Sequence, residues 1–310
     1  MDLISFVIPC FQSRESLVHL CKEILDLARR RDVAVEIVLV LDSRDISQSG
    51  LFDDPVFASE QVRIVELSRN FGQHNALVAG ISRTTGQFIV TLDDDYQHDP
   101  RDAFFLVDQL VNETALDLIY ATPRQPRQTL GRSIAGSLVR VVLRLAGLRN
   151  AKMISPFRAF RGDFRRAFDG IPGPTVSVDI VLSWVVGPTK SVNVDYQERS
   201  HGVSGYSLAK LFRLALTYLT SHSVGPLRLS FVAGLAGLIV TAGSGIFTLV
   251  SYLAGRISEP GFTTVALLVA FTGSLQLFIL GILGEYIGQQ HRRGISFPLN
   301  FVLRDSGPRK

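Results

Sequence analysis

The chain contains little cysteine and little tryptophan. Only two of its 310 residues are cysteine and one is tryptophan. Cys10 and Cys21 lack the spacing of a zinc site and give no basis for a disulfide framework, so they fit a reducing compartment, with Cys10 expected in a buried strand. No internal repeat or low-complexity tract is present. These absences exclude a disulfide scaffold and a repeat array.

Three further features are missing. Met1-Asp2 is followed at once by an apolar run, without the basic leader and cleavage site of a secretory signal, so we expect none. The formal net charge is only +4, with a pI near 9.2, and such a mildly basic chain suits anionic partners: nucleic acid, phosphorylated substrates or a membrane surface. Basic residues do not form a stripe with base-stacking aromatics, so we expect no nucleic-acid partner.

Hydrophobic residues, by contrast, are abundant, at 46% of the chain with a mean hydropathy of +0.25. Leu229–Ala254 runs 26 residues without a charge, and Gly261–Leu283 runs 23. Crossing the hydrocarbon core takes about 20 residues, so both segments are long enough to span a bilayer. Arg228 precedes the first segment and basic residues 291–293 follow the second, which places both termini in the cytoplasm.

Two amphipathic stretches precede the apolar segments. Ser207–Thr220 is apolar over much of a helix and carries Lys210 and Arg213, which suits an interfacial helix leading into the membrane. Thr129–Leu148 has a helical pattern with arginines among apolar residues. It either packs on the sheet or lies on a membrane surface.

Strand-like runs alternate with helical patterns in the first two hundred residues. The predicted strands are Leu3–Pro9, Val35–Leu41, Val62–Leu67, Phe88–Leu92, Leu118–Ala121 and Ser191–Gln197. The predicted helices are Glu15–Arg31, Gln73–Ser82, Asp102–Val111 and Ser177–Val186. This alternation predicts an α/β fold with a doubly wound, mostly parallel sheet.

The most informative stretch is Phe88–Gln97, where a buried-strand run ends in three carboxylates. Open α/β sheets bind ligands outside the carboxyl ends of their strands. Alternate residues of an extended chain point the same way, so Asp93, Asp95 and Gln97 share a face. Two carboxylates and an amide oxygen are hard donors suited to Mg²⁺ or Mn²⁺. The alternative is an acidic turn that caps the next helix at Asp99-Pro100.

A second strand also ends in an acidic residue. Asp42 follows Val35–Leu41, and the ends of parallel strands lie near one another, so Asp42 and Asp93–Asp95 are expected to line one crevice. The alternative for Asp42 is an ordinary turn aspartate.

Several short motifs follow one another along almost the whole chain: Phe6–Phe11, Leu67–His74 with Ala79-Gly80, Thr91–Gln97, Ser155–Phe160, Glu198–Ser204 and Leu283–Gly288. In this order, ahead of two apolar segments, they resemble the membrane-anchored family-two glycosyltransferases that load a sugar onto polyprenyl phosphate. That group includes dolichyl-phosphate mannose synthases, bacterial polyprenyl-phosphate glucosyltransferases and undecaprenyl-phosphate aminoarabinose (4-deoxy-4-formamido-L-arabinose) transferases. Residues 70–74 and 284–288 are most similar to the two bacterial branches.

The resemblance implies a GT-A, Rossmann-like domain in the cytoplasm over residues 1–205. It further implies an interfacial helix over 206–228, transmembrane helices over 229–254 and 261–284, a short non-cytoplasmic hairpin over 255–260 and a cytoplasmic tail over 285–310. The protein would then be a multi-pass protein of the inner membrane. A homo-oligomer is also implied, because bacterial relatives can form tetramers.

The implied reaction moves a sugar, with inversion, from a nucleotide-diphosphate sugar to undecaprenyl phosphate, with UDP favoured over GDP and with Mg²⁺ or Mn²⁺ as cofactor. The product would serve glycan modification in the cell envelope, such as that of lipopolysaccharide. Two other interpretations stay open. One is a degenerate membrane scaffold of the same fold. The other is a processive polysaccharide synthase, which normally needs a Gln-x-x-Arg-Trp motif and more spans, and Trp184 lacks that context.

Site residues are carried over from the resemblance position by position. Those assigned to the nucleotide sugar are Pro9, Phe11, Asp42, Asn70, Asp93 and Asp94. Those assigned to the metal are Asp93, Asp95 and Gln97. Those assigned to the acceptor and its phosphate are Arg124, Arg127, Ser155, Arg158, Arg199 and Ser204. The residues expected to carry catalysis are Asp93, Asp95, Arg124, Arg158 and Arg199.

The chain departs from the family pattern at three places. Gln12-Ser13 replaces an Asn-Glu pair, and Leu41 replaces the first aspartate of an Asp-Asp-Gly-Ser motif. Gly205 stands where a lysine normally follows the loop serine, which removes a phosphate contact. Either Arg199, Arg161 or another basic residue substitutes for that lysine, or this chain is slow or altered in donor choice.

Overall fold

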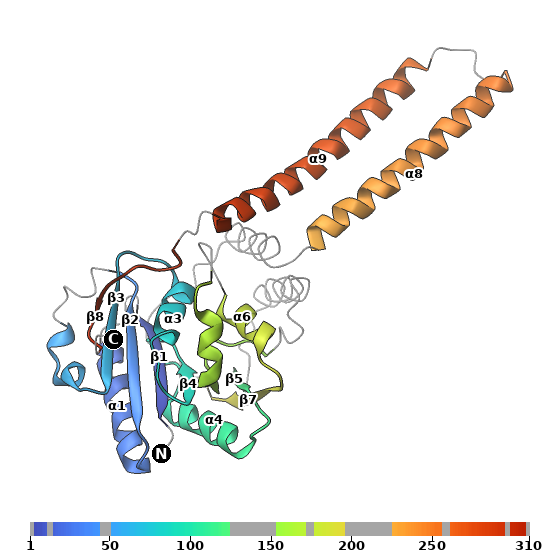
Figure 1. Ribbon diagram of the computed structural model, residues 1–310. Coiled ribbons are helices and arrows are strands. Elements are labelled where there is room, and N and C mark those ends of the chain that lie inside the picture. Colours follow the sequence, from blue (N-terminus) through green and yellow to red (C-terminus); the bar gives the residue numbers. More distant parts are fainter. Residues whose placement is uncertain are drawn as a thin grey trace. The chain divides into compact units, whose positions relative to one another are not determined.

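The computed structural model describes residues 3–10, 15–43, 51–124, 153–171, 177–195, 225–255, 261–294 and 298–307. These residues belong to two compact units. One unit contains an eight-stranded sheet with its helices and includes the C-terminal residues, and the other contains two long helices (Figure 1). The helices predicted over 129–148 and 207–220 lie outside the described residues.

The sheet is mostly parallel, as predicted. Its strands are β1 (Ile4–Cys10), β2 (Val35–Leu41), β3 (Val62–Leu67), β4 (Phe88–Thr91), β5 (Leu118–Pro123), β6 (Arg158–Arg161), β7 (Thr189–Val194) and β8 (Val302–Asp305). Their order is β7-β5-β6-β4-β1-β2-β3-β8. Strands β6 and β8 run antiparallel to their neighbours, and the other six share one direction. The six predicted strands are confirmed to within three residues at either end, whereas β6 and β8 were not predicted.

Helices cover both faces of the sheet (Figure 1). They are α1 (Glu15–Arg31), α3 (Gln73–Ile81), α4 (Pro100–Asn112) and α6 (Val178–Val185), with short 3-10 turns η1 (Leu51–Asp53), η2 (Pro55–Ala58) and η3 (Gly162–Phe168). Alternate residues of β1 belong to different cores: Phe6 and Ile8 join the core with α1 and α4, and Val7 joins the core with α3 and α6. Burial on both faces explains why these strands read as continuous apolar runs.

The start of α4 shows which acidic residue caps this helix. The Asp99 side chain accepts a hydrogen bond from the Arg101 amide at 2.8 Å, and Pro100 occupies the first helical position. Asp99 is therefore the N-cap residue. The three carboxylates of Asp93–Asp95 lie ahead of this cap and are not needed for it.

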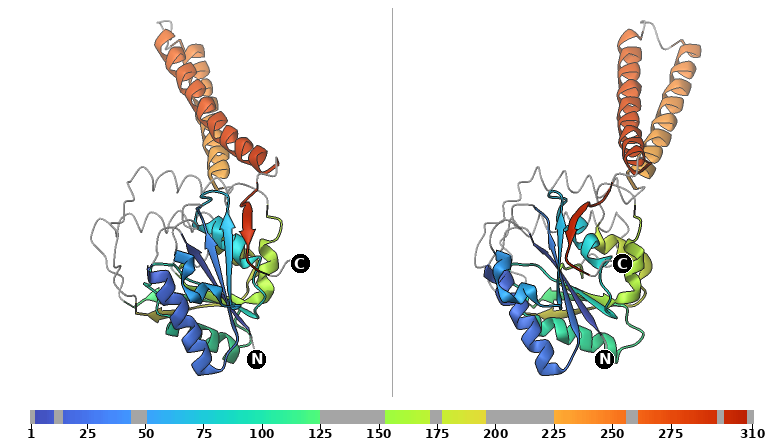
Figure 2. Two further views of the ribbon diagram at one scale, coloured as in Figure 1. Left: turned by 90° about the vertical axis from the view of Figure 1, so that its left-hand side faces the viewer. Right: turned by 60° about the vertical axis from the view of Figure 1, so that its left-hand side comes forward.

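The described residues of the second unit form α8 (Gly225–Leu253) and α9 (Phe262–Gly294). Gly234–Leu253 and Phe271–Gly288 are long and apolar enough to cross a membrane. The segment predicted as a tail over 285–310 contains the end of a helix and a strand. Helix α9 continues to Gly294, and the chain then returns to the sheet as β8, which lies beside β3 (Figure 2).

Gly80 sets how closely α3 approaches the sheet. A Cβ atom there would lie 2.5 Å from Val7 Cγ1 and 2.9 Å from Val40 Cγ2. We expect Gly80→Ala to lower the free energy of unfolding by about 1–3 kcal/mol, because overpacking forces the strands or the helix to shift. Thermal unfolding followed by the fluorescence of Trp184, the single tryptophan, measures this. Gly243→Ala is the control, because a Cβ atom at Gly243 meets nothing within 4 Å. Equal melting temperatures for the two variants would contradict the expectation.

Candidate functional site

The carboxyl ends of the six parallel strands lie along one edge of the sheet, here called the carboxyl edge. The chain passes from β1 to β2 and β3 on one side of β1, and then places β4 on the other side. Strand order therefore reverses between β1 and β4, and open α/β sheets bind ligands at such a reversal. Asp93–Asp95 directly follow Leu92 at the end of β4, and Asp42 follows β2.

Residues 93–97, here called the acidic turn, are partly accessible to solvent and are ordered by hydrogen bonds. Asp93, Asp94 and Asp95 are each partly exposed. Gln73 Nε2 donates to Asp93 Oδ1 at 2.5 Å, and the Gln97 amide donates to Asp95 Oδ1 at 3.2 Å. Two carboxylates that the sequence placed on one face are thus each fixed by a neighbouring amide group.

Helix α1 supports the same turn from the side. Ser16 Oγ donates to the Asp94 carbonyl oxygen at 2.8 Å. Tyr96 has a φ of +58°, which is uncommon for a bulky residue. Its hydroxyl donates to a carboxylate oxygen of Glu23, and its ring lies 4.9 Å from that of His19. Such backbone strain clusters at ligand sites, where surrounding contacts hold it in place.

His98 supports the turn from below and was not singled out by the sequence. It is only 2% exposed, and its ring stacks on that of Phe157 with the centroids 4.7 Å apart. Burial lowers the pKa of His98 to about 4. The imidazole is therefore neutral at neutral pH, and its Nδ1 atom accepts a hydrogen bond from the Asp93 amide at 3.4 Å.

Asp42 holds the loop between β3 and α3. Its two carboxylate oxygens accept hydrogen bonds from the amides of Phe71 (2.7 Å) and Gly72 (2.8 Å). Burial raises the pKa of Asp42, while these two amides and the charge of Arg69 act to lower it. Gly72 has a φ of +88°, a conformation that favours glycine. Gln73, the first residue of α3, follows this loop directly, so Asp42 and Asp93 are connected through residues 71–73.

Arg158 lies inside the domain, where its guanidinium group pairs with Asp179. Arg158 is 1% exposed, and it donates to the Asp179 carboxylate and, from Nε, to Thr91 Oγ1 at 2.9 Å. The Tyr120 hydroxyl donates to the same Asp179 oxygen at 3.0 Å. Burial raises the pKa of Tyr120, so it remains a donor. This polar cluster joins β4, β5, β6 and α6, and its Thr91 precedes Asp93 by two residues.

The structure brings most of the predicted residues to the carboxyl edge. These are Pro9, Asp42, Asn70, Asp93, Asp94, Asp95, Gln97 and Arg124. Arg124 follows β5 and pairs with Asp195 at 3.5 Å, with both side chains largely exposed. Ser155 and Arg158 are buried instead, and Ser155 Oγ accepts a hydrogen bond from the Phe157 amide. Phe11, Arg127, Arg199 and Ser204 lie outside the described residues.

The acidic turn fits a divalent cation held partly by a substrate. Within the described ranges, no group of three or more His, Cys, Asp or Glu side chains is arranged to hold a metal. Mg²⁺ commonly takes one or two protein carboxylates and completes its shell with water and substrate phosphates. The partly exposed carboxylates of Asp93 and Asp95 match that donor set.

The buried pair generates a prediction about stability. We expect Asp179→Asn to cost about 3–5 kcal/mol of unfolding free energy, because it leaves the Arg158 charge buried without its counter-charge. The double variant Arg158→Met/Asp179→Leu should recover much of that loss, since it removes both charges. Chemical denaturation measured for the wild-type, single and double variants tests this. A double variant less stable than Asp179→Asn would contradict the prediction.

Two known families match this chain. Glycosyl transferase family 2 matches residues 5–163, and the GtrB C-terminal hairpin family matches residues 225–290. The undecaprenyl-phosphate 4-deoxy-4-formamido-L-arabinose transferase of Sodalis glossinidius is 32% identical over 309 residues, which cover 97% of this chain and 93% of that protein. An uncharacterized glycosyltransferase of Synechocystis is 28% identical over 305 residues, or 96% of this chain and 94% of that protein.

The solved structures share the fold at low sequence identity. Glucosyl-3-phosphoglycerate synthase from Mycobacterium tuberculosis, in complex with phosphoglyceric acid, has a TM-score of 0.52 at 20% identity, covering 71% of this chain and 80% of that one. Mannosyl-3-phosphoglycerate synthase from Rubrobacter xylanophilus has a TM-score of 0.50 at 16% identity, covering 83% and 76%. The sheet therefore has the GT-A fold. The two apolar helices, together with relatives named as undecaprenyl-phosphate transferases, indicate a membrane-associated protein. The chain belongs to glycosyl transferase family 2.

Proposed function

We propose that this protein transfers a sugar from a nucleotide-diphosphate sugar to a polyprenyl phosphate at a membrane. The observation that carries the proposal is the pair of accessible carboxylates at the strand-order reversal, in a chain that also carries an apolar helical hairpin. Relatives at about 30% identity over nearly the whole chain are named undecaprenyl-phosphate 4-deoxy-4-formamido-L-arabinose transferases. Their name supports undecaprenyl phosphate as the acceptor.

The donor half of the site is built around the acidic turn. Asp93 and Asp95, with Gln97, would hold Mg²⁺ or Mn²⁺, which when bound neutralises charge on the departing diphosphate. Gln73 and Gln97 fix the two carboxylates, and Asp42 orders the neighbouring loop. A glucosyl-3-phosphoglycerate synthase of the same fold has been solved with Mn²⁺ and UDP, which favours UDP over GDP here.

The acceptor half needs positive charge for a phosphate. Arg124 offers an exposed guanidinium group at the end of β5, and Arg127, Arg199 and Ser204 are assigned to the same task by their motifs. A phosphate oxygen of the acceptor would attack the anomeric carbon, forming the new C–O bond as the bond to the nucleoside diphosphate breaks. The acceptor phosphate is already ionised at neutral pH, so no strong general base is required. Catalysis would rest on positioning and electrostatics.

The buried Arg158 would serve this site through the backbone. Its bond to Thr91 fixes the end of β4, and Thr91 Oγ1 in turn donates to the Pro156 carbonyl oxygen at 2.7 Å. Asp93 follows two residues later. We therefore assign Arg158 a positioning role in place of the direct phosphate contact expected from the motif.

The order of the elements along the chain supports a single-sided topology. Strands β1 to β7 precede α8 in the sequence. Strand β8 follows α9 and belongs to the same sheet. If α8 and α9 each cross the bilayer, residues 256–260 lie on the opposite side from the sheet. The basic residues that flank the hairpin favour a cytoplasmic catalytic domain at the inner membrane. A homo-oligomer of this chain is part of the same proposal.

Transfer of radiolabel from a panel of UDP- and GDP-sugars to undecaprenyl phosphate tests the activity. Purified full-length protein with Mg²⁺ or Mn²⁺ should move label from one donor into organic-extractable lipid, and EDTA should abolish the transfer. Asp95→Asn should lower the rate by about a hundredfold or more, because several kcal/mol of transition-state stabilisation are lost. Asp108→Asn is the control, since Asp108 lies on the exposed face of α4 and pairs with Arg31. Undiminished transfer by a folded Asp95→Asn variant would refute the donor site.

Cysteine labelling tests the topology. Cys10 and Cys21 are buried, and burial raises the pKa of Cys21 to about 12, so neither should react in the folded protein. A membrane-impermeant maleimide added to intact cells should label Ser258→Cys and leave Glu60→Cys unlabelled. Breaking the membrane should make Glu60→Cys reactive, because Glu60 is exposed in the catalytic domain. The reverse pattern in intact cells would contradict a cytoplasmic sheet.

A further inference from the structure

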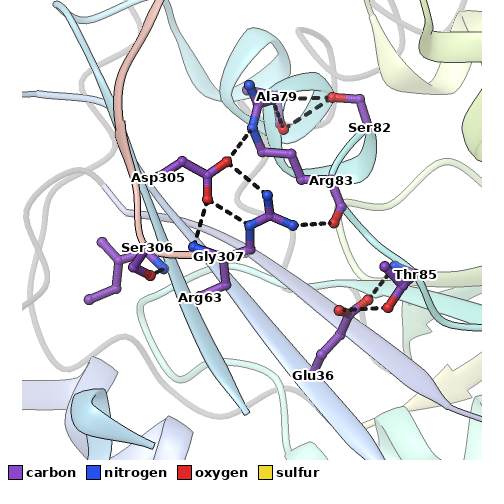
Figure 3. Close-up of polar contacts among 10 residues, drawn as sticks. Glu36, Arg63, Ala79, Ser82, Arg83, Thr85, Asp305, Ser306 and Gly307 are labelled. Carbon is purple, nitrogen blue, oxygen red and sulfur yellow. Dashed lines mark hydrogen bonds and ion pairs between the residues drawn. The ribbon is translucent and has the colours of Figure 1, made fainter. Parts of the chain in front are cut away.

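The C-terminal residues are fastened to the sheet by one aspartate and two arginines (Figure 3). Asp305 accepts hydrogen bonds from Arg63 Nε (2.7 Å) and Nη2 (2.8 Å), and from Arg83 Nε (3.0 Å). Arg63 lies on β3, and Arg83 lies just after α3. Burial raises the pKa of Asp305, but its hydrogen bonds with Arg63, Gly307 and Arg83 and the Arg63 charge outweigh burial and hold the pKa below the usual value. The Asp305 carboxylate is thus ionised, and it accepts charge-assisted hydrogen bonds from both arginines.

Backbone contacts extend this attachment along β3. The Ile64 amide donates to Ser306 Oγ at 2.8 Å, and the Ser306 amide donates to the Ile64 carbonyl oxygen at 3.0 Å. Strand β8 pairs with β3 from Val65 to Leu67. Residues 299–307, here called the C-terminal strap, therefore complete the edge of the sheet next to β3.

The first residues of the strap contact the loop that leads to the donor site. The Ser68 amide donates to the Phe301 carbonyl oxygen at 2.9 Å, and Asn300 Nδ2 donates to the Asn75 carbonyl oxygen at 3.5 Å. Leu299 is 8% exposed and packs in the core that α3 forms with the sheet. The strap thus holds both ends of the segment from residue 68 to residue 75.

This segment is the one that reaches the acidic turn. Its Phe71 and Gly72 amides donate hydrogen bonds to the Asp42 carboxylate, and its Gln73 side chain donates one to Asp93. Gln73 itself is exposed, so its position depends on the backbone that carries it. A continuous series of contacts therefore runs from Asp305 through β3 and the strap to the first carboxylate of the turn.

We propose that the C-terminal strap is a positioning element of the donor site, which acts by holding residues 68–75 so that Gln73 orients Asp93. This inference rests on the proposed function for its ligand, a divalent cation with a nucleoside diphosphate. It assigns the segment that follows the membrane hairpin a part in donor binding. Asp305 and Gln73 are its positioning residues.

A double-mutant cycle on the full-length protein tests the strap, with Mn²⁺–UDP as the probe. Asp305→Ala should raise amide exchange in residues 68–75 and weaken Mn²⁺–UDP binding about tenfold, because charge-assisted bonds are lost at the far end of the series. Gln73→Ala should weaken binding to a similar extent without raising exchange along β8. The double variant should bind no more weakly than Gln73→Ala alone, since both changes act through one contact. Donor KM should rise in each variant more than kcat falls.

Arg304→Ala is the matched control on the same strand. The Arg304 side chain is 85% exposed, and its Nε atom lies 3.9 Å from Glu66 Oε2, which makes this a long ion pair. This variant should leave both exchange and binding unchanged. The proposed role of the strap would be overturned if the losses of Mn²⁺–UDP affinity added up in the double variant. Unchanged amide exchange in residues 68–75 of Asp305→Ala would overturn it as well. Normal binding of Mn²⁺–UDP without transfer by the wild-type protein would count against the proposed function alone, because the binding cycle still decides the strap. A wild-type protein that binds neither Mn²⁺–UDP nor Mn²⁺–GDP would refute both.

Discussion

The shared direction of the six parallel strands is the constraint on which the site depends. Each strand delivers its following residue to the same edge, so residues as far apart in sequence as Asp42, Asp93 and Arg124 lie along that edge. Because the sheet is covered on both faces, those edges are the places where polar side chains remain accessible. The acidic turn follows β4 at the reversal of strand order between β1 and β4, which is where open α/β sheets bind their ligands.

The charged groups of this domain divide according to how their charge is balanced. Asp179 is buried, and it is matched by Arg158 because an unpaired buried charge is costly. Asp93 and Asp95 are partly exposed, and each accepts a hydrogen bond from a neutral amide, Gln73 Nε2 or the Gln97 N–H. Accessible carboxylates at the end of a strand are suited to a ligand that arrives from solvent, such as a cation. The buried Arg158–Asp179 pair is suited to holding strands together.

Much of the fold followed from the apolar runs, and the failures have physical causes. Strand β6 was missed because Arg158 and Arg161 begin and end its four residues. The charge of Arg158 is balanced by Asp179, and Arg161 donates to the carbonyl oxygens of Leu110 and Leu116 near the end of α4, but such partners cannot be read from local sequence. Helix α9 was ended at the membrane boundary, since hydropathy reports the span and not the helix. The acidic turn itself was found because strand and carboxylates are adjacent in sequence.

The missed strand β8 changes what the catalytic domain is. Without it, β3 would be an edge strand with unpaired backbone groups, which favours pairing with other chains. The residues that cover this edge come from beyond both apolar helices, so residues 1–205 do not complete the sheet by themselves. Composition marks the apolar hairpin as the end of the sheet domain, whereas the pairing of β8 with β3 shows that sheet residues lie on both sides of the hairpin in the sequence. The sheet of the catalytic unit is therefore built from residues on both sides of the hairpin in the sequence, and the hairpin is an insertion between β7 and β8.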